Sequence, residues 1–106
     1  MESRKYARFQ VELECAFSGD HTAEDGQVVD LSMGGCKVRS DATVPTGAYL
    51  ELRVYLPQQD SPLKIDLAVA RWSIGRECGL EFIRLQTEQQ ERLHQLVQSF
   101  EVASSR

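Results

Sequence analysis

The chain has 106 residues, which suffices for one domain with a single hydrophobic core but not for two. Its composition, 42% apolar and 26% charged, is that of a soluble globular domain, and it has neither a run of about 18 apolar residues nor an apolar signal-peptide stretch. A net charge of −4 disfavours the broad cationic face that general nucleic-acid binding requires. We therefore expect a cytoplasmic protein that neither inserts into a membrane nor binds a nucleic acid polymer.

Alternating apolar and polar residues predict about six short strands. The first is the clearest, because Leu13, Cys15 and Phe17 share one parity and Glu12 and Glu14 the other. The six strand signals fall at residues 9–17, 27–32, 35–40, 50–56, 65–72 and 78–82. Residues 18–26 are expected to form a loop, and a bend is expected at the glycine pair 34–35.

The end of the chain changes to helical spacing. Thr87 and Gln90 have the form of a capping box, and apolar residues then recur at 93, 96, 97 and 100. Because six short strands would expose their edges unless they closed on themselves, the predicted fold is mainly β: a six-stranded antiparallel β-barrel with a C-terminal α-helix. We expect a flexible basic arm at 1–8, the barrel at 9–86, the helix at 87–101 and a tail at 102–106.

No pattern in the sequence predicts catalysis or metal binding. His21 and His94 have no neighbour that would pair them with a nucleophile, and both are expected on the surface. The three cysteines, Cys15, Cys36 and Cys78, form no CxxC pattern and are expected to be buried thiols. We therefore expect no enzyme, no catalytic residue, no metal site and no cofactor.

Two short motifs single out candidate binding residues. In "RKYAR", Arg4 and Arg8 form an RxxxR pair, in a segment (residues 1–9) that carries three cations against one carboxylate. In "DLSMGG", Asp30, Ser32 and Gly35 form DxSxxG at the bend between the second and third strand signals. Each motif alone is weak, but their order, separation and strand context are specific.

With both motifs present, the chain resembles the PilZ domain family from about Arg4 to Phe100, and "CGLEF" is similar to the last strand of that family. The resemblance implies a six-stranded barrel with a C-terminal helix that binds the bacterial second messenger cyclic di-GMP. It further implies an adaptor in which binding orders the basic arm and alters a surface for an unidentified effector protein. Motility, exopolysaccharide and pili are the processes that such proteins control.

The resemblance also implies a role for each motif residue toward cyclic di-GMP. Arg4 and Arg8 would clamp phosphate and guanine, because a guanidinium both forks to phosphate oxygens and stacks on a ring. Asp30 would accept from the N1 and N2 donors of guanine, and Ser32 would add a small donor and acceptor. Gly35, with Gly34 sharing its role, would let the backbone approach the ligand or take a positive φ.

Trp72 lies seven residues before Gly79, where some PilZ members have an aromatic residue beside the ligand, and both a ligand contact and a core position stay open for it. Arg39, Arg71 and Arg76 could complete a basic rim, although no motif supports them.

The motif residues also have plain structural interpretations. The two arginines could be a solvated arm, and Asp30 and Ser32 could be turn formers. The alternative function is therefore a PilZ-like protein-interaction adaptor that binds no nucleotide. A nucleic-acid-binding barrel is disfavoured, because the outward candidates Tyr49 and Tyr55 flank Glu51 as well as Arg53.

Overall fold

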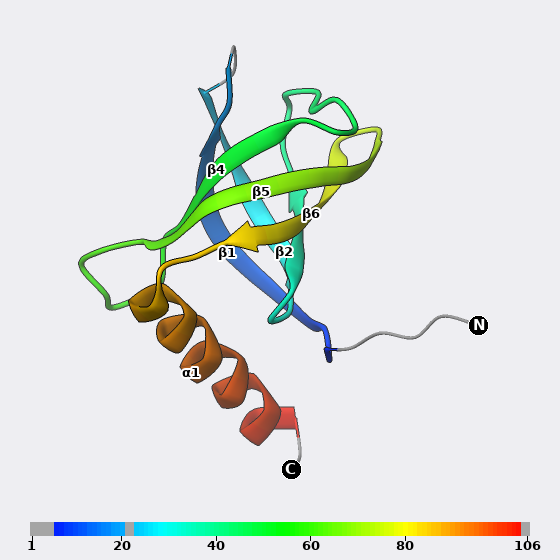
Figure 1. The fold of residues 1–106 in the computed structure, drawn as a ribbon. Coiled ribbons are helices and arrows are strands. Elements are labelled where there is room, and N and C mark those ends of the chain that lie inside the picture. The colour runs from blue at the N-terminus through cyan, green and yellow to red at the C-terminus, as the bar shows by residue number, and fades with distance from the viewer. Residues whose placement is uncertain (1–5, 21–22, 105–106) are drawn as a thin grey trace.

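The computed structural model describes residues 6–20 and 23–104, which form a closed barrel of six antiparallel strands and one helix (Figure 1). The elements are β1 (Phe9–Ser18), β2 (Ala23–Leu31), β3 (Gly35–Arg39), β4 (Tyr49–Val54), β5 (Leu63–Ile74), β6 (Glu77–Arg84) and α1 (Thr87–Ser104). The predicted fold class is confirmed.

The strands follow the order β1-β2-β3-β6-β5-β4 around the barrel. Each half is therefore a run of three strands in which neighbours in sequence are neighbours in space. The two halves meet twice, where β3 pairs with β6 and where β1 pairs with β4. Closure leaves no open sheet edge, which explains how such short strands avoid edge-to-edge association.

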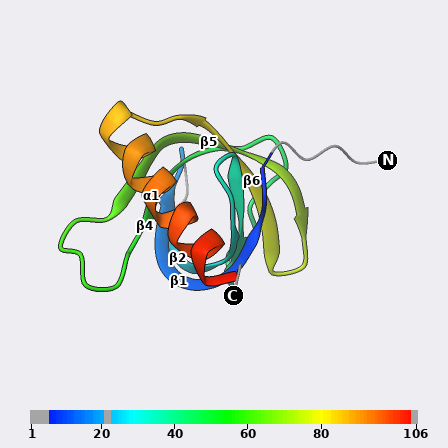
Figure 2. The ribbon, with the colours of Figure 1, turned by 90° about the horizontal axis from the view of Figure 1, so that it is seen from below.

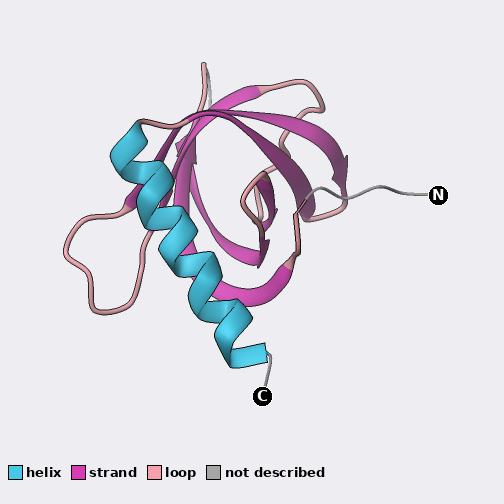
Figure 3. Ribbon diagram, turned by 60° about the horizontal axis from the view of Figure 1, so that its bottom comes forward, coloured by secondary structure: helices cyan, strands magenta, loops and turns pink. Residues whose placement is uncertain are grey.

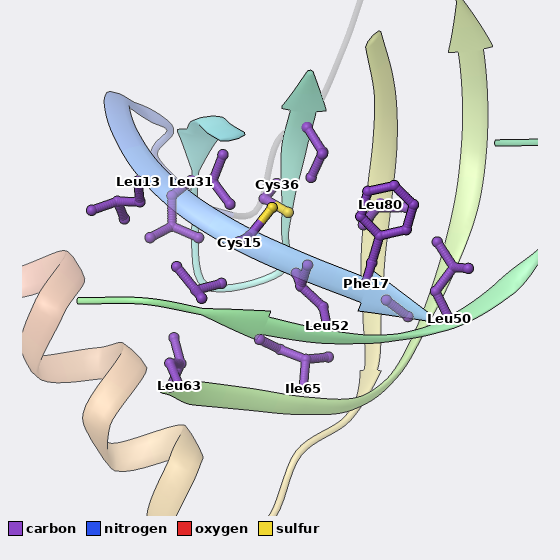
Figure 4. Packing of buried hydrophobic residues seen from close by; sticks show 14 of the residues in the cluster. Leu13, Cys15, Phe17, Leu31, Cys36, Leu50, Leu52, Leu63, Ile65 and Leu80 are labelled. Carbon is purple, nitrogen blue, oxygen red and sulfur yellow. The ribbon is translucent and has the colours of Figure 1, made fainter. Parts of the chain in front are cut away.

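The barrel interior is filled by the apolar parity of the strands (Figure 4). Leu13, Cys15 and Phe17 point inward from β1 as their alternation predicts. Cys15, Cys36 and Cys78 are free and buried, as expected. Burial raises the pKa of the Cys15 thiol to about 12 and also raises the pKa of Cys36 and of Cys78, so the three thiols stay protonated at neutral pH.

Helix α1 lies across one end of the barrel (Figures 2 and 3). Leu93 and Val97 are buried in the common core, and the Phe100 ring lies 5.8 Å from the Phe9 ring, centroid to centroid. Arg92 fixes the helix to the β4–β5 connection by donating to the carbonyl oxygens of Ser61 at 2.7 Å and Pro62 at 2.9 Å. No helix among the described residues is long and apolar enough to span a membrane.

Strand β2 begins at Ala23, so the expected loop over residues 18–26 is wrong at both ends. Ser18 pairs with Ala23 and Phe17 with Glu24, which extends the β1–β2 hairpin through polar residues. Ala23, Glu24 and Asp25 at the start of β2 are exposed and show no apolar alternation, so only the pairing with β1 makes them a strand.

The ends of the helix also differ from expectation. It begins at Thr87 as expected but continues to Ser104, so residues 102–104 are helical, since no Gly or Pro interrupts them. The predicted capping box is wrong. Thr87 is the first helical residue and not the cap, because Gln90 N–H donates to the carbonyl of Gln86 and the Gln90 amide donates to that of Leu85.

Truncating Leu93 to Ala should lower the free energy of unfolding by about 2–5 kcal/mol, because the side chain is 1% exposed and its loss leaves a cavity between helix and barrel. The measurement is chemical denaturation of the purified domain. His94→Ala, at the next and exposed position, is the matched control and should change stability by less than about 0.5 kcal/mol. Equal stability of the two variants would contradict the packing of α1 described above.

Candidate functional site

A hollow of about 350 Å³ lies on the outer surface of the barrel, beside the start of β1 and the β2–β3 bend. These two segments lie side by side in Figure 1, although about twenty residues separate them in sequence. The hollow is lined by Tyr6, Arg8, Ser32, Gly34, Gly35, Arg71, Trp72, Leu80 and Glu81. It thus joins residues of both sequence motifs with residues of β5 and β6.

Arg8 is the residue immediately before β1, and its side chain lines this hollow. Its Nε–H donates to Asp30, at 3.1 Å from Oδ1 and 3.5 Å from Oδ2, and both side chains are partly buried. Asp30 itself does not line the hollow but lies behind the guanidinium. The carboxylate therefore orients Arg8, while the terminal nitrogens of Arg8 make no hydrogen bond to any described residue.

Ser32 shapes the bend between β2 and β3. Its hydroxyl donates to the Gly35 carbonyl at 3.3 Å and accepts from the Gly34 N–H at 3.2 Å, and its own N–H donates to the same Gly35 carbonyl at 2.9 Å. The hydrogen bonds of Ser32 are therefore those of a turn-forming residue. The residue also lines the hollow.

Gly35 is needed for a close approach between strands. A Cβ at this position would collide with the carbonyl oxygen of Leu80 on β6. The alternative expectation of a positive φ is wrong, because the described glycines with positive φ are Gly47 and Gly75. At Gly34, a Cβ would lie 2.9 Å from the Tyr6 ring, so this glycine makes room for an aromatic side chain.

Trp72 lies on the outside of the barrel. Of the two positions left open by the sequence, the core position is therefore wrong. The Trp72 side chain covers Gly79, the residue it pairs with on β6, and a Cβ on that glycine would collide with the indole Nε1. The indole remains 36% exposed and forms a wall of the hollow. A β-bulge at Arg71, between Ala70 and Trp72, turns both Arg71 and Trp72 outward.

Tyr6, Leu80 and Glu81 line the hollow but were not proposed as site residues from the sequence. Tyr6 shares the parity of Arg8, a signal that could have found it. Glu81 lies within the "CGLEF" segment, but nothing in the sequence placed that segment beside the two motifs, because β6 reaches the site only through barrel closure. Glu81 forms an ion pair with Arg71, whose Nε–H donates to Oε1.

The remaining candidates lie elsewhere. Arg4 is outside the described residues. Arg39 is paired with Glu77, Arg76 lies near Asp41, and neither lines the hollow. His94 is exposed on α1, as expected. Among the described residues no group of three or more His, Cys, Asp or Glu side chains could hold a metal ion.

The sequence model of the PilZ domain matches residues 2–99 of the chain. The chain belongs to the PilZ domain family. A comparison with curated proteins finds no match. Both motifs and all six strands lie within the matched residues, so the hollow is a feature of the PilZ domain itself.

Solved PilZ structures share this fold at low sequence identity. The inhibitor of motility MotI/DgrA from Bacillus subtilis gives a TM-score of 0.80 at 20% identity, over 100% of this chain and 55% of that one. The PilZ domain of YcgR from Escherichia coli, solved with c-di-GMP, gives 0.77 at 15%, over 97% and 95%. The PilZ domain of CeSA from a cellulose-synthesizing bacterium gives 0.71 at 18%, over 90% and 98%. The chain therefore spans about half of MotI and nearly all of each isolated PilZ domain.

Replacing Gly79 by Ala should displace the Trp72 indole, because the new methyl group would occupy the position of the ring. Trp72 is the only tryptophan, so its fluorescence emission reports the change directly. We expect a shifted emission spectrum with an unchanged far-ultraviolet circular dichroism spectrum. Ser73→Ala, beside Trp72 on the same strand, is the control and should leave the emission as it is. An unshifted spectrum in Gly79→Ala would show that the indole does not lie over this glycine.

Proposed function

We propose that this PilZ domain is a receptor for cyclic di-GMP, and that it binds the nucleotide without chemically changing it. The observation that carries the proposal is the hollow, in which Arg8, the bend of the DxSxxG motif and Trp72 line one surface. The solved YcgR PilZ domain with c-di-GMP, which shares the fold, supports the choice of ligand.

The lining matches the two chemical parts of cyclic di-GMP. Its phosphodiesters carry negative charge, and the terminal nitrogens of Arg8 are available to donate to them. Its guanines are flat, and Trp72 and Tyr6 offer aromatic faces for stacking. Gly34 and Gly35 also line the hollow, where the missing side chains make room for the Tyr6 ring and for the Leu80 carbonyl on β6. Arg4, by the resemblance, would add a second guanidinium from the same arm.

The position of Arg8 next to β1 supports a change in the N-terminal arm when the ligand binds. A ligand that contacts Arg4 together with Arg8 and Tyr6 would hold residues 1–8 against the barrel and so alter its surface. In this proposal the receptor acts in the cytoplasm as an adaptor, and an unidentified effector protein that recognises the altered surface carries the signal to motility, exopolysaccharide or pili.

One observation favours the alternative, an interaction adaptor that binds no nucleotide. Both arginines that line the hollow are already paired, Arg8 with Asp30 and Arg71 with Glu81. A nucleotide would have to compete with these carboxylates. Calorimetric titration with cyclic di-GMP, cyclic di-AMP and a single-stranded oligonucleotide separates the functions. The receptor binds the first preferentially, the adaptor binds none, and a nucleic-acid-binding barrel prefers the third.

Replacing Arg8 by Ala should weaken cyclic di-GMP binding by about tenfold to several hundredfold, because up to two charge-assisted hydrogen bonds to phosphate are lost. The measurement is the dissociation constant by calorimetry. Arg39→Ala, which also removes an arginine from a carboxylate pair but lies outside the hollow, should bind as the wild type does. Wild-type affinity in Arg8→Ala would remove this arginine from the binding site.

Replacing Asp30 by Ala distinguishes a guanine contact from the orientation of Arg8. If the carboxylate accepts from guanine N1 and N2, the variant loses a few kcal/mol for cyclic di-GMP and little for cyclic di-AMP, so selectivity collapses. If Asp30 only orients Arg8, both nucleotides lose affinity by the same factor. We expect the equal loss, because Asp30 lies outside the lining of the hollow and holds Arg8 through Nε. The measurement is the pair of dissociation constants, with the melting temperature as the control for folding.

A further inference from the structure

We infer that Arg71 is a second phosphate-binding arginine of the hollow and that Glu81 is an acidic latch that holds it and lowers the affinity for the nucleotide. This inference rests on the proposed function and extends it to two residues that belong to neither sequence motif. It predicts that removing a single carboxylate from the site makes binding tighter.

The bulge in β5 delivers Arg71 to the site. On β6, the consecutive residues Leu80 and Gly79 pair with Ala70 and Trp72, so Arg71 is the extra residue between them. A regular strand would send Arg71 and Trp72 to opposite faces, whereas the bulge exposes both on the outside of the barrel. The guanidinium is thereby placed in the wall of the hollow next to the indole.

Glu81 approaches the same hollow from β6. It pairs across the barrel seam with Gly35, the last residue of the DxSxxG motif, and its carboxylate accepts from the Arg71 Nε–H. The side chains of Arg71 and Glu81 are 60% and 49% exposed. An ion pair this exposed contributes little to stability and exchanges readily with another anion. The terminal nitrogens of Arg71 make no hydrogen bond to described residues and remain available to phosphate.

The charges around the hollow balance in the described part of the chain. Arg8 and Arg71 are its two cations, Glu81 lines it, and Asp30 lies directly behind Arg8. Two cations against two carboxylates give no net attraction for an anionic ligand. Neutralising Glu81 would both release Arg71 and leave one net positive charge at the site, which favours a ligand with two phosphodiesters.

The test is calorimetric titration of Glu81→Gln with cyclic di-GMP, at low and moderate salt. We expect binding about three- to tenfold tighter than wild type, with the gain shrinking as salt screens the charges. Arg71→Ala should bind more weakly than wild type. The matched control is Glu77→Gln, on the same strand, which removes a carboxylate paired with Arg39 outside the hollow and should leave the affinity unchanged.

The double variant Glu81→Gln with Arg71→Ala separates a latch from general repulsion. If Glu81 acts by holding Arg71, the gain from Glu81→Gln disappears when Arg71 is absent. A gain that persists in the double variant overturns the latch. Wild-type binding that Glu81→Gln leaves unchanged also overturns it, while the proposed function stands. Failure of both the wild type and Glu81→Gln to bind overturns the proposed function and the latch together.

Discussion

The pairing of β3 with β6 is the contact on which the rest of this structure depends. It joins the two three-stranded halves of the chain, and it brings the DxSxxG bend against the strand that carries Gly79 and Glu81. The approach is so close that residue 35 has no room for a side chain beside the Leu80 carbonyl. The same backbone contact therefore closes the barrel and makes the floor of the hollow, so fold and site cannot be altered independently there.

Two aromatic rings rest on glycines around this seam. The Tyr6 ring lies against Gly34, and the Trp72 indole covers Gly79. A strand surface normally presents a side chain at every second residue, and the glycines remove those side chains where the rings lie. The result is a recess with two aromatic walls on the outside of the barrel, a shape that suits a stacked purine base.

The electrostatics of the site oppose its proposed ligand as much as they favour it. Each arginine of the hollow is held by a carboxylate, Arg8 through Nε by Asp30 and Arg71 through Nε by Glu81. These pairs fix the direction of the guanidinium groups before any ligand arrives, which reduces the conformational entropy lost on binding. They also set a threshold, because a phosphate must compete with a carboxylate already in place.

The sequence by itself determined the barrel, the buried thiols and one wall of the site. The period-two pattern of Leu13, Cys15 and Phe17 depends only on local alternation, and the bend of the DxSxxG motif is held by local hydrogen bonds of Ser32. Only the tertiary structure decided the polar start of β2, which exists through its pairing with β1. The bulge at Arg71 and the arrival of Glu81 were likewise decided by register across strands that are distant in sequence. The period-two pattern shows which side chains face inward, but it does not show where an extra residue bulges or which distant residue lies opposite.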